Sequence, residues 1–145
     1  MSETECISPI LVAVLVTLDV QEEPLEATRA RAKAANLSNV EFVRANLEVP
    51  GSSSLADNSQ DIVLVANILF QSPKKSEIVH EAKRVLKDNG QLVMVEWKKG
   101  TKGLGPPDEM RLDEETTKQL VIHEGLTVQK EMPAGQFHFA LISKK

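Results

Sequence analysis

Aliphatic runs alternate along the chain with segments that favour helices. The runs ILVAVLVTL (residues 10–18) and IVLVA (62–66) lack the polar alternation of a strand with one wet face. Each therefore predicts a strand covered on both sides, as in a parallel sheet. A closing pair of strands is predicted to turn near Ala134 and Gly135. The predicted strands are 10–18, 40–43, 62–66, 92–95 and two within 126–142.

Three segments between these runs predict helices. Residues 22–35 are rich in Glu, Ala, Arg and Lys, which are strong helix formers. Apolar residues recur at helical spacing in 76–87, with Asn89-Gly90 as a left-handed stop. Residues 113–124 predict a third helix, closed by Gly125. Turn formers at 50–59 predict a surface loop.

This order of elements predicts one α/β domain over residues 1–145, with residues 1–9 flexible. We expect a Rossmann-like, mostly parallel sheet with helices on both faces and a C-terminal antiparallel strand pair. In such sheets ligands bind at the carboxyl ends of the strands, so the residues just after each run are the informative ones.

Composition narrows the class of function. A net charge of −4 disfavours nucleic acid as a partner. The run 10–18 is far shorter than the ~20 residues of a membrane-spanning helix, and no Lys or Arg precedes it, as a secretory signal would require. The single cysteine, Cys6, has no partner for a disulfide and no metal-ligand spacing with the histidines. We therefore expect a cytoplasmic protein without a metal site or membrane association.

Polar residues follow the first two runs. A carboxylate at Asp19 can accept hydrogen bonds from ribose hydroxyls in nucleotide-binding folds. The favoured alternative is that Asp19 and Glu22 form a helix capping box. Asn46 could read an adenine edge through its amide, although an Asn in a turn needs no ligand to explain it.

The later strand ends carry further candidates. Asn67 ends the 62–66 run, where it can face a cofactor or simply turn the chain. Glu96 could act as a base, but a carboxylate at a strand end is more often solvated. Trp97 could form a pocket wall or cover the sheet edge, and His138 could do acid-base chemistry at a cleft. The other two histidines, on predicted helices, are expected to face solvent.

Three longer segments resemble class I S-adenosylmethionine-dependent methyltransferases, closest to the small-molecule branch typified by quinone-biosynthesis enzymes. They are LDVQEEPLEATRARAKAANLSNVEFVRANLEVP, NSQDIVLVANILFQ and EAKRVLKDNGQLVMVEWK. The resemblance runs from about Leu18 to Lys145, and its most specific part is Glu81 to Gly90 leading into a strand that ends in Glu96-Trp97.

The resemblance implies roles for particular residues. Asp19 corresponds to the ribose-binding acid, and Asn46 stands where the family usually has an aspartate near the adenine amino group. The resemblance assigns no residue as a catalytic base. The residues implied on the cofactor side are Asp19, Val20, Asn46, Leu47 and Asn67, and those on the acceptor side are Trp97 and His138.

The chain departs from the family pattern at its start. The family's glycine-rich loop, which lets backbone approach the methionine part of the cofactor, has no counterpart, since the first glycine is Gly51. We therefore expect an N-terminally truncated methyltransferase fold in which 10–18 pairs directly with 62–66. An exposed strand edge would favour a homodimer or a complete homologue as partner.

Three functions are compatible with these features. The first is S-adenosylmethionine-dependent methyl transfer to a small-molecule acceptor. The second is a non-catalytic, truncated or degenerate methyltransferase homologue that acts as a binding partner. A dinucleotide-binding domain ranks last, because G-x-G-x-x-G is also missing.

Overall fold

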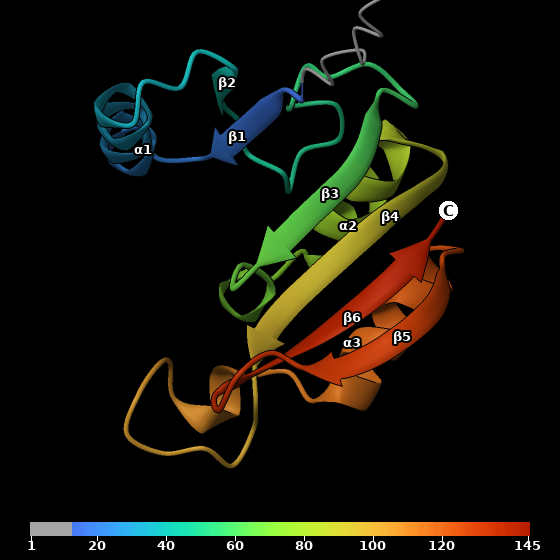
Figure 1. Ribbon diagram of the computed structural model, residues 1–145. Helices are drawn as coiled ribbons and strands as arrows, with labels where there is room; N and C mark the ends of the chain where they lie inside the picture. Colours follow the sequence, from blue (N-terminus) through green and yellow to red (C-terminus); the bar gives the residue numbers. More distant parts are fainter. Residues whose placement is uncertain (1–12) are drawn as a thin grey trace, which may run out of the picture. The chain divides into compact units, whose positions relative to one another are not determined.

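The computed structural model describes residues 13–145, which form two compact units, 13–46 and Leu47–Lys145 (Figure 1). The expected flexibility of residues 1–9 lies outside the described residues, as does the start of the 10–18 run. The elements in chain order are β1 (Leu15–Asp19), α1 (Glu22–Ala34), β2 (Val40–Arg44), β3 (Gln60–Ala66), the 3-10 helix η1 (Leu69–Gln71), α2 (Lys75–Val85), β4 (Leu86–Trp97), the 3-10 helix η2 (Asp108–Met110), α3 (Glu114–His123), β5 (Thr127–Pro133) and β6 (His138–Lys144).

The first unit is a parallel strand pair joined by a helix. β1 and β2 pair in parallel from Leu15 opposite Val40 to Asp19 opposite Arg44. Between them α1 buries Leu25 and, less deeply, Ala32. The carboxyl ends of both strands therefore lie side by side, at Asp19 and Arg44.

The second unit is a four-stranded sheet in the order β3-β4-β6-β5. β3 and β4 are parallel, whereas β6 is antiparallel to both β4 and β5. Helices α2 and α3 lie together on one face of this sheet (Figure 1). The α/β class and the closing antiparallel pair predicted from the sequence are confirmed.

The core of the second unit lies between the sheet and its two helices. The helix predicted from the apolar spacing of α2 is confirmed, because the residues at that spacing are the ones that face the sheet. The cluster comprises Val65, Leu69, Ile78, Val79, Ala82, Leu86, Leu92, Met94, Val121, Leu126, Phe139 and Leu141.

Two helix ends show how the local sequence sets the boundaries. α3 begins after Asp113, whose side chain accepts a hydrogen bond from the Thr116 N–H, and Gly125 follows it with φ of 81°. α2 ends at Val85, short of the predicted stop, because buried Leu86 already adopts extended backbone. Asn89 does have a positive φ, of 65°, but within β4.

Within the first unit β1 pairs with β2, and within the second unit β3 is the edge strand that pairs with β4. The predicted pairing of the first run with 62–66 would join the two units and stays a prediction. Full coverage of the 62–66 run is wrong, since Ile62 and Leu64 are 62% and 64% exposed. Both helices of this unit pack on the other face, where Val63 and Val65 point.

No helix within residues 13–145 has the length and apolar character needed to cross a lipid bilayer.

Candidate functional site

Asp19 stands at the carboxyl end of β1, where the sequence places it. Its Oδ1 accepts a hydrogen bond from the Gln21 N–H at 2.8 Å. The N-cap of α1 is Gln21, without a side-chain cap bond, so the favoured capping box of Asp19 and Glu22 does not form. Among the contacts of the described residues, the second carboxylate oxygen of Asp19 has no partner, which leaves it able to accept from a ligand.

The other candidates near Asp19 follow β1 and β2. Val20 is exposed, and its carbonyl accepts a hydrogen bond from Arg44 Nε at 3.1 Å. The Ala45 N–H donates to the Asp19 carbonyl at 2.9 Å, which extends the pairing of the two strands up to Asn46. Asp19, Val20 and Asn46 therefore stand at or just beyond the carboxyl ends of the paired strands β1 and β2. Leu47 belongs to the second unit, where it packs against the core.

Asn67 turns the chain directly after β3. Its φ is 55°, a left-handed conformation that Asn tolerates better than most residues, and its N–H donates to the Val95 carbonyl at 2.8 Å. The turning role is therefore confirmed, but it does not use the side chain. Asn67 Oδ1 is buried without a hydrogen-bond partner among the described residues, and a buried acceptor of this kind calls for a donor.

Glu96 lies at the end of β4 and is 1% exposed, so the expectation of a solvated carboxylate is wrong. Its Oε1 accepts hydrogen bonds from the N–H groups of Ile68 and Leu69 at 3.2 and 3.0 Å. Oε2 is buried and has no partner in the described chain. Burial raises the pKa of this carboxyl, while the two N–H donors and the charge of Lys75 oppose the rise.

Trp97 and His138 face each other from neighbouring strands. They are paired across β4 and β6, and their ring centroids lie 4.1 Å apart at an interplanar angle of 41°. His138 Nε2 is buried and unpartnered among the described residues. The rings lie on the sheet face opposite Glu96, because successive side chains of a strand alternate.

The Gly- and Pro-rich loop after β4 packs on the Trp97 ring, a contact that the sequence does not predict. Arg111, 5% exposed, donates to the carbonyls of Lys98, Thr101, Leu104 and Pro106 at 2.6 to 2.9 Å. Its guanidinium lies 5.6 Å from the Trp97 ring centroid. A side chain on Gly105 would come within 2.7 Å of the same ring. Trp97 is thus a covered ring rather than an open pocket wall on this side.

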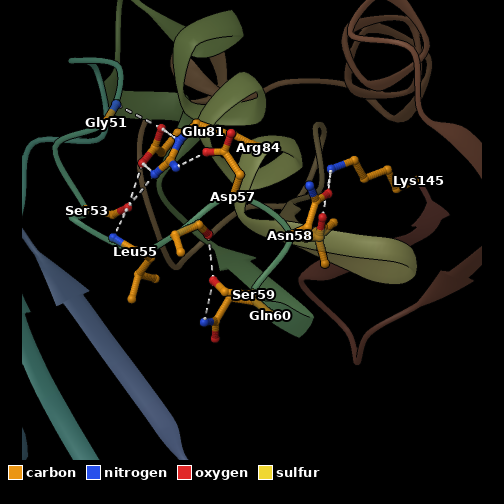
Figure 2. A network of polar contacts seen from close by, with 12 residues as sticks. Gly51, Ser53, Leu55, Asp57, Asn58, Ser59, Gln60, Glu81, Arg84 and Lys145 are labelled. Carbon is orange, nitrogen blue, oxygen red and sulfur yellow. Dashed lines mark hydrogen bonds and ion pairs between the residues drawn. The ribbon is translucent and has the colours of Figure 1, made fainter.

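A second buried glutamate anchors a different loop (Figure 2). Glu81 of α2 accepts hydrogen bonds from the Gly51 N–H at 3.0 Å, the Ser53 hydroxyl at 2.6 Å and two nitrogens of Arg84 at 2.7 and 2.9 Å. Arg84 also contacts Asp57 at 2.6 Å. These donors, Arg84 foremost, lower the pKa of Glu81 to about 2 although burial opposes them.

Within residues 13–145, three of the four buried side-chain atoms without a partner therefore lie at one end of the second unit's sheet. They belong to Asn67, Glu96 and His138, which stand at the carboxyl ends of β3 and β4 and at the start of β6. The other two histidines, His80 and His123, are exposed as expected.

Comparison with known proteins identifies the family of this chain. A family model described as a methyltransferase domain matches residues 11–136. A demethylmenaquinone methyltransferase of Listeria welshimeri is 36% identical over 80 residues, which cover 54% of this chain and 32% of that protein. The chain thus spans about a third of the curated relatives it matches.

Solved structures agree with this match. An S-adenosylmethionine-dependent methyltransferase from Aquifex aeolicus superposes with a TM-score of 0.80 at 25% identity, covering 90% of this chain and 68% of that one. An S-adenosylmethionine-dependent methyltransferase from Methanosarcina mazei shares the fold with a TM-score of 0.69 at 20% identity, covering 90% of this chain and 81% of that one.

Proposed function

Because this chain belongs to the methyltransferase domain family, we propose that it binds S-adenosylmethionine and transfers the methyl group to a small-molecule acceptor. The cofactor, when bound, supplies a methyl group carried on a positively charged sulfur. Alignment and proximity provide much of the acceleration in such a displacement, so a dedicated base is not required.

The observation that carries the proposal is the free carboxylate oxygen of Asp19 at the end of β1. A carboxylate there suits the two hydroxyls of a ribose, because it accepts two donors at once. The buried, unpartnered Oδ1 of Asn67 is a second acceptor that fits a donor-rich ligand. Each of these acceptors, taken by itself, suits a hydroxyl or amino group of the cofactor. Val20, Asn46 and Leu47 are further proposed contacts.

On the acceptor side we propose Trp97 and His138. Their contact shows that this strand end already packs one flat ring against another. The unpartnered Nε2 of His138 can accept a hydrogen bond from, or donate one to, a polar group of the acceptor. The curated relative named above is a demethylmenaquinone methyltransferase, which supports a small-molecule acceptor for this chain too.

The test is calorimetric titration of the full chain with S-adenosylhomocysteine. Asp19→Ala should weaken binding by about 1 to 3 kcal/mol, the cost of removing a charged hydrogen-bond acceptor. Asp19→Asn is the matched control, since it can keep the turn to Gln21 while removing the charge. A folded chain that binds no S-adenosylhomocysteine would refute the proposal and favour a non-catalytic homologue that serves as a binding partner.

A further inference from the structure

We propose that Glu96 is a positioning residue for the turn formed by residues 67–72, between β3 and α2. Its carboxylate holds this turn through the N–H groups of Ile68 and Leu69. In this way it fixes the side-chain amide of Asn67 for the cofactor. This inference rests on the proposed function. It concerns a buried carboxylate to which neither the fold nor the family match assigns a role.

Glu96 contacts the backbone of the turn directly. One oxygen of Glu96 receives two successive backbone N–H groups, at 3.2 Å from Ile68 and 3.0 Å from Leu69. These two residues follow Asn67 directly, at the point where the chain leaves β3 for α2. Glu96 projects from β4 on the helix-covered face of the sheet, together with buried Leu92 and Met94.

The contact with Glu96 helps to fix the backbone of Asn67. Asn67 has a left-handed φ of 55°, a conformation that Asn tolerates and that contacts on either side help to hold. On its N-terminal side, the Asn67 N–H is tied to the Val95 carbonyl. On its C-terminal side, Glu96 provides the only side-chain hydrogen bonds to Ile68 and Leu69 among the described residues. Strand β4 therefore restrains Asn67 from both sides.

Glu96 can hold the turn without a negative charge. Its Oε2 is buried without a partner in the described chain, and burial raises the pKa of the carboxyl. A neutral acid retains the carbonyl oxygen that accepts both N–H groups. Holding the turn therefore requires the oxygen and the length of the side chain, but not the charge.

The chain offers a matched control in Glu81. It too is a buried glutamate of the second unit that accepts an N–H from a loop, at Gly51. Its loop contacts are Gly51 and Ser53, neither of which is proposed to bind the cofactor. Loss of Glu81 should thus lower stability without a specific loss of cofactor affinity.

The experiment compares variants of the full chain in two assays, calorimetric titration with S-adenosylhomocysteine and amide hydrogen exchange without ligand. Glu96→Leu removes the acceptor and should weaken binding about tenfold, the equivalent of roughly 1.4 kcal/mol. It should also accelerate exchange at the Ile68 and Leu69 amides about tenfold or more. Glu96→Gln keeps the oxygen and the length, so both values should stay within about twofold of wild type.

Two further variants separate positioning from a general loss of structure. Asn67→Gly keeps the left-handed backbone but removes the side-chain amide. Adding Glu96→Leu to Asn67→Gly should weaken cofactor binding less than Glu96→Leu does in the wild type, because both changes act through the same amide. Glu81→Gln should leave the affinity within about twofold. Glu96→Asp, one methylene too short to reach the turn, replaces Glu96→Leu if the latter does not fold.

The outcomes are distinct. Wild-type affinity in Glu96→Leu, or equal weakening by Glu81→Gln, would overturn the inference and leave the proposed function standing. Unchanged exchange at Ile68 and Leu69 in Glu96→Leu would overturn it as well. A wild-type chain that binds no S-adenosylhomocysteine would overturn the proposed function and this inference together.

Discussion

Glu81 makes the stability of the second unit depend on acid. It is 2% exposed and accepts four hydrogen bonds, two of them from Arg84. Its pKa is lowered from 4.5 to about 2, chiefly by Arg84. Because the folded chain holds the ionised form more tightly than the unfolded chain does, this stabilisation is complete above about pH 5 and is lost as the pH falls toward 2.

The magnitude follows from the two pKa values. A difference of 2.5 units between 4.5 and about 2 corresponds to about 3 kcal/mol at neutral pH. Roughly 2 kcal/mol of this should already be gone at pH 3, where the unfolded chain is mostly protonated at this site. We expect Glu81→Gln to be less stable than wild type by about 3 kcal/mol at pH 7, and the difference to shrink to about 1 kcal/mol at pH 3.

The assay is urea unfolding of both proteins between pH 7 and pH 3, followed by the fluorescence of Trp97. This residue is the only tryptophan, and it lies in the second unit. Titrations of the other carboxyl groups cancel in the difference between the two proteins. Asp57→Asn removes the exposed partner of Arg84 and should cost less than about 1 kcal/mol. A gap between wild type and Glu81→Gln that stays constant with pH would refute the reasoning.

Two other features give sharp expectations. Gly105→Ala should cost about 3 kcal/mol in urea unfolding, because φ is 85° and the new methyl would meet the Trp97 ring at 2.7 Å. Gly103→Ala, with a similar φ and open space, should cost only about 1 kcal/mol, and equal costs would show that the ring contact is unimportant. We also propose that β3 pairs with β3 of a second copy, since an antiparallel register centred on its middle residue sets exposed Ile62 opposite exposed Leu64. Light scattering should then show a dimer that Leu64→Lys dissociates, and a wild-type monomer at all concentrations would contradict this.

The elements most accurately predicted from the sequence are those whose packing repeats along the chain. The sequence predicts α2 because Ile78, Val79, Ala82 and Val85 share one helical face and that face meets the sheet. The helix ends two residues before its predicted end. Leu86 is apolar enough to continue the helical pattern, yet it is buried in extended backbone at the start of β4.

Coverage of the strands could not be read in the same way. An aliphatic run such as 62–66 predicts burial on both faces, but burial depends on which helices pack against each face. In the second unit α2 and α3 share one face, and Leu64 on the other is exposed. The run alone carries no information about the partners of a strand.

The buried polar residues were the hardest to predict. Glu96 follows a strand, where most carboxylates are solvated, and its burial results from a turn nearly thirty residues earlier in the sequence. Arg111 lies between a Gly- and Pro-rich loop and a helix, with no periodic pattern around it. In both cases the side chain is buried because backbone groups distant in sequence satisfy it, and local patterns do not contain those contacts.

The structure distinguishes between two roles that the sequence allows for Asp19, helix capping and ligand binding. An acid followed three residues later by Glu22 fits both a capping box and a ligand-binding strand end. A capping box needs the acid at the N-cap and the glutamate at the third helical position, but Glu22 is the first residue of α1. The reciprocal contact is therefore unavailable. Loss of the Asp19 carboxylate should consequently cost α1 little stability, so a large change in cofactor affinity in Asp19→Ala would report contact with the ligand.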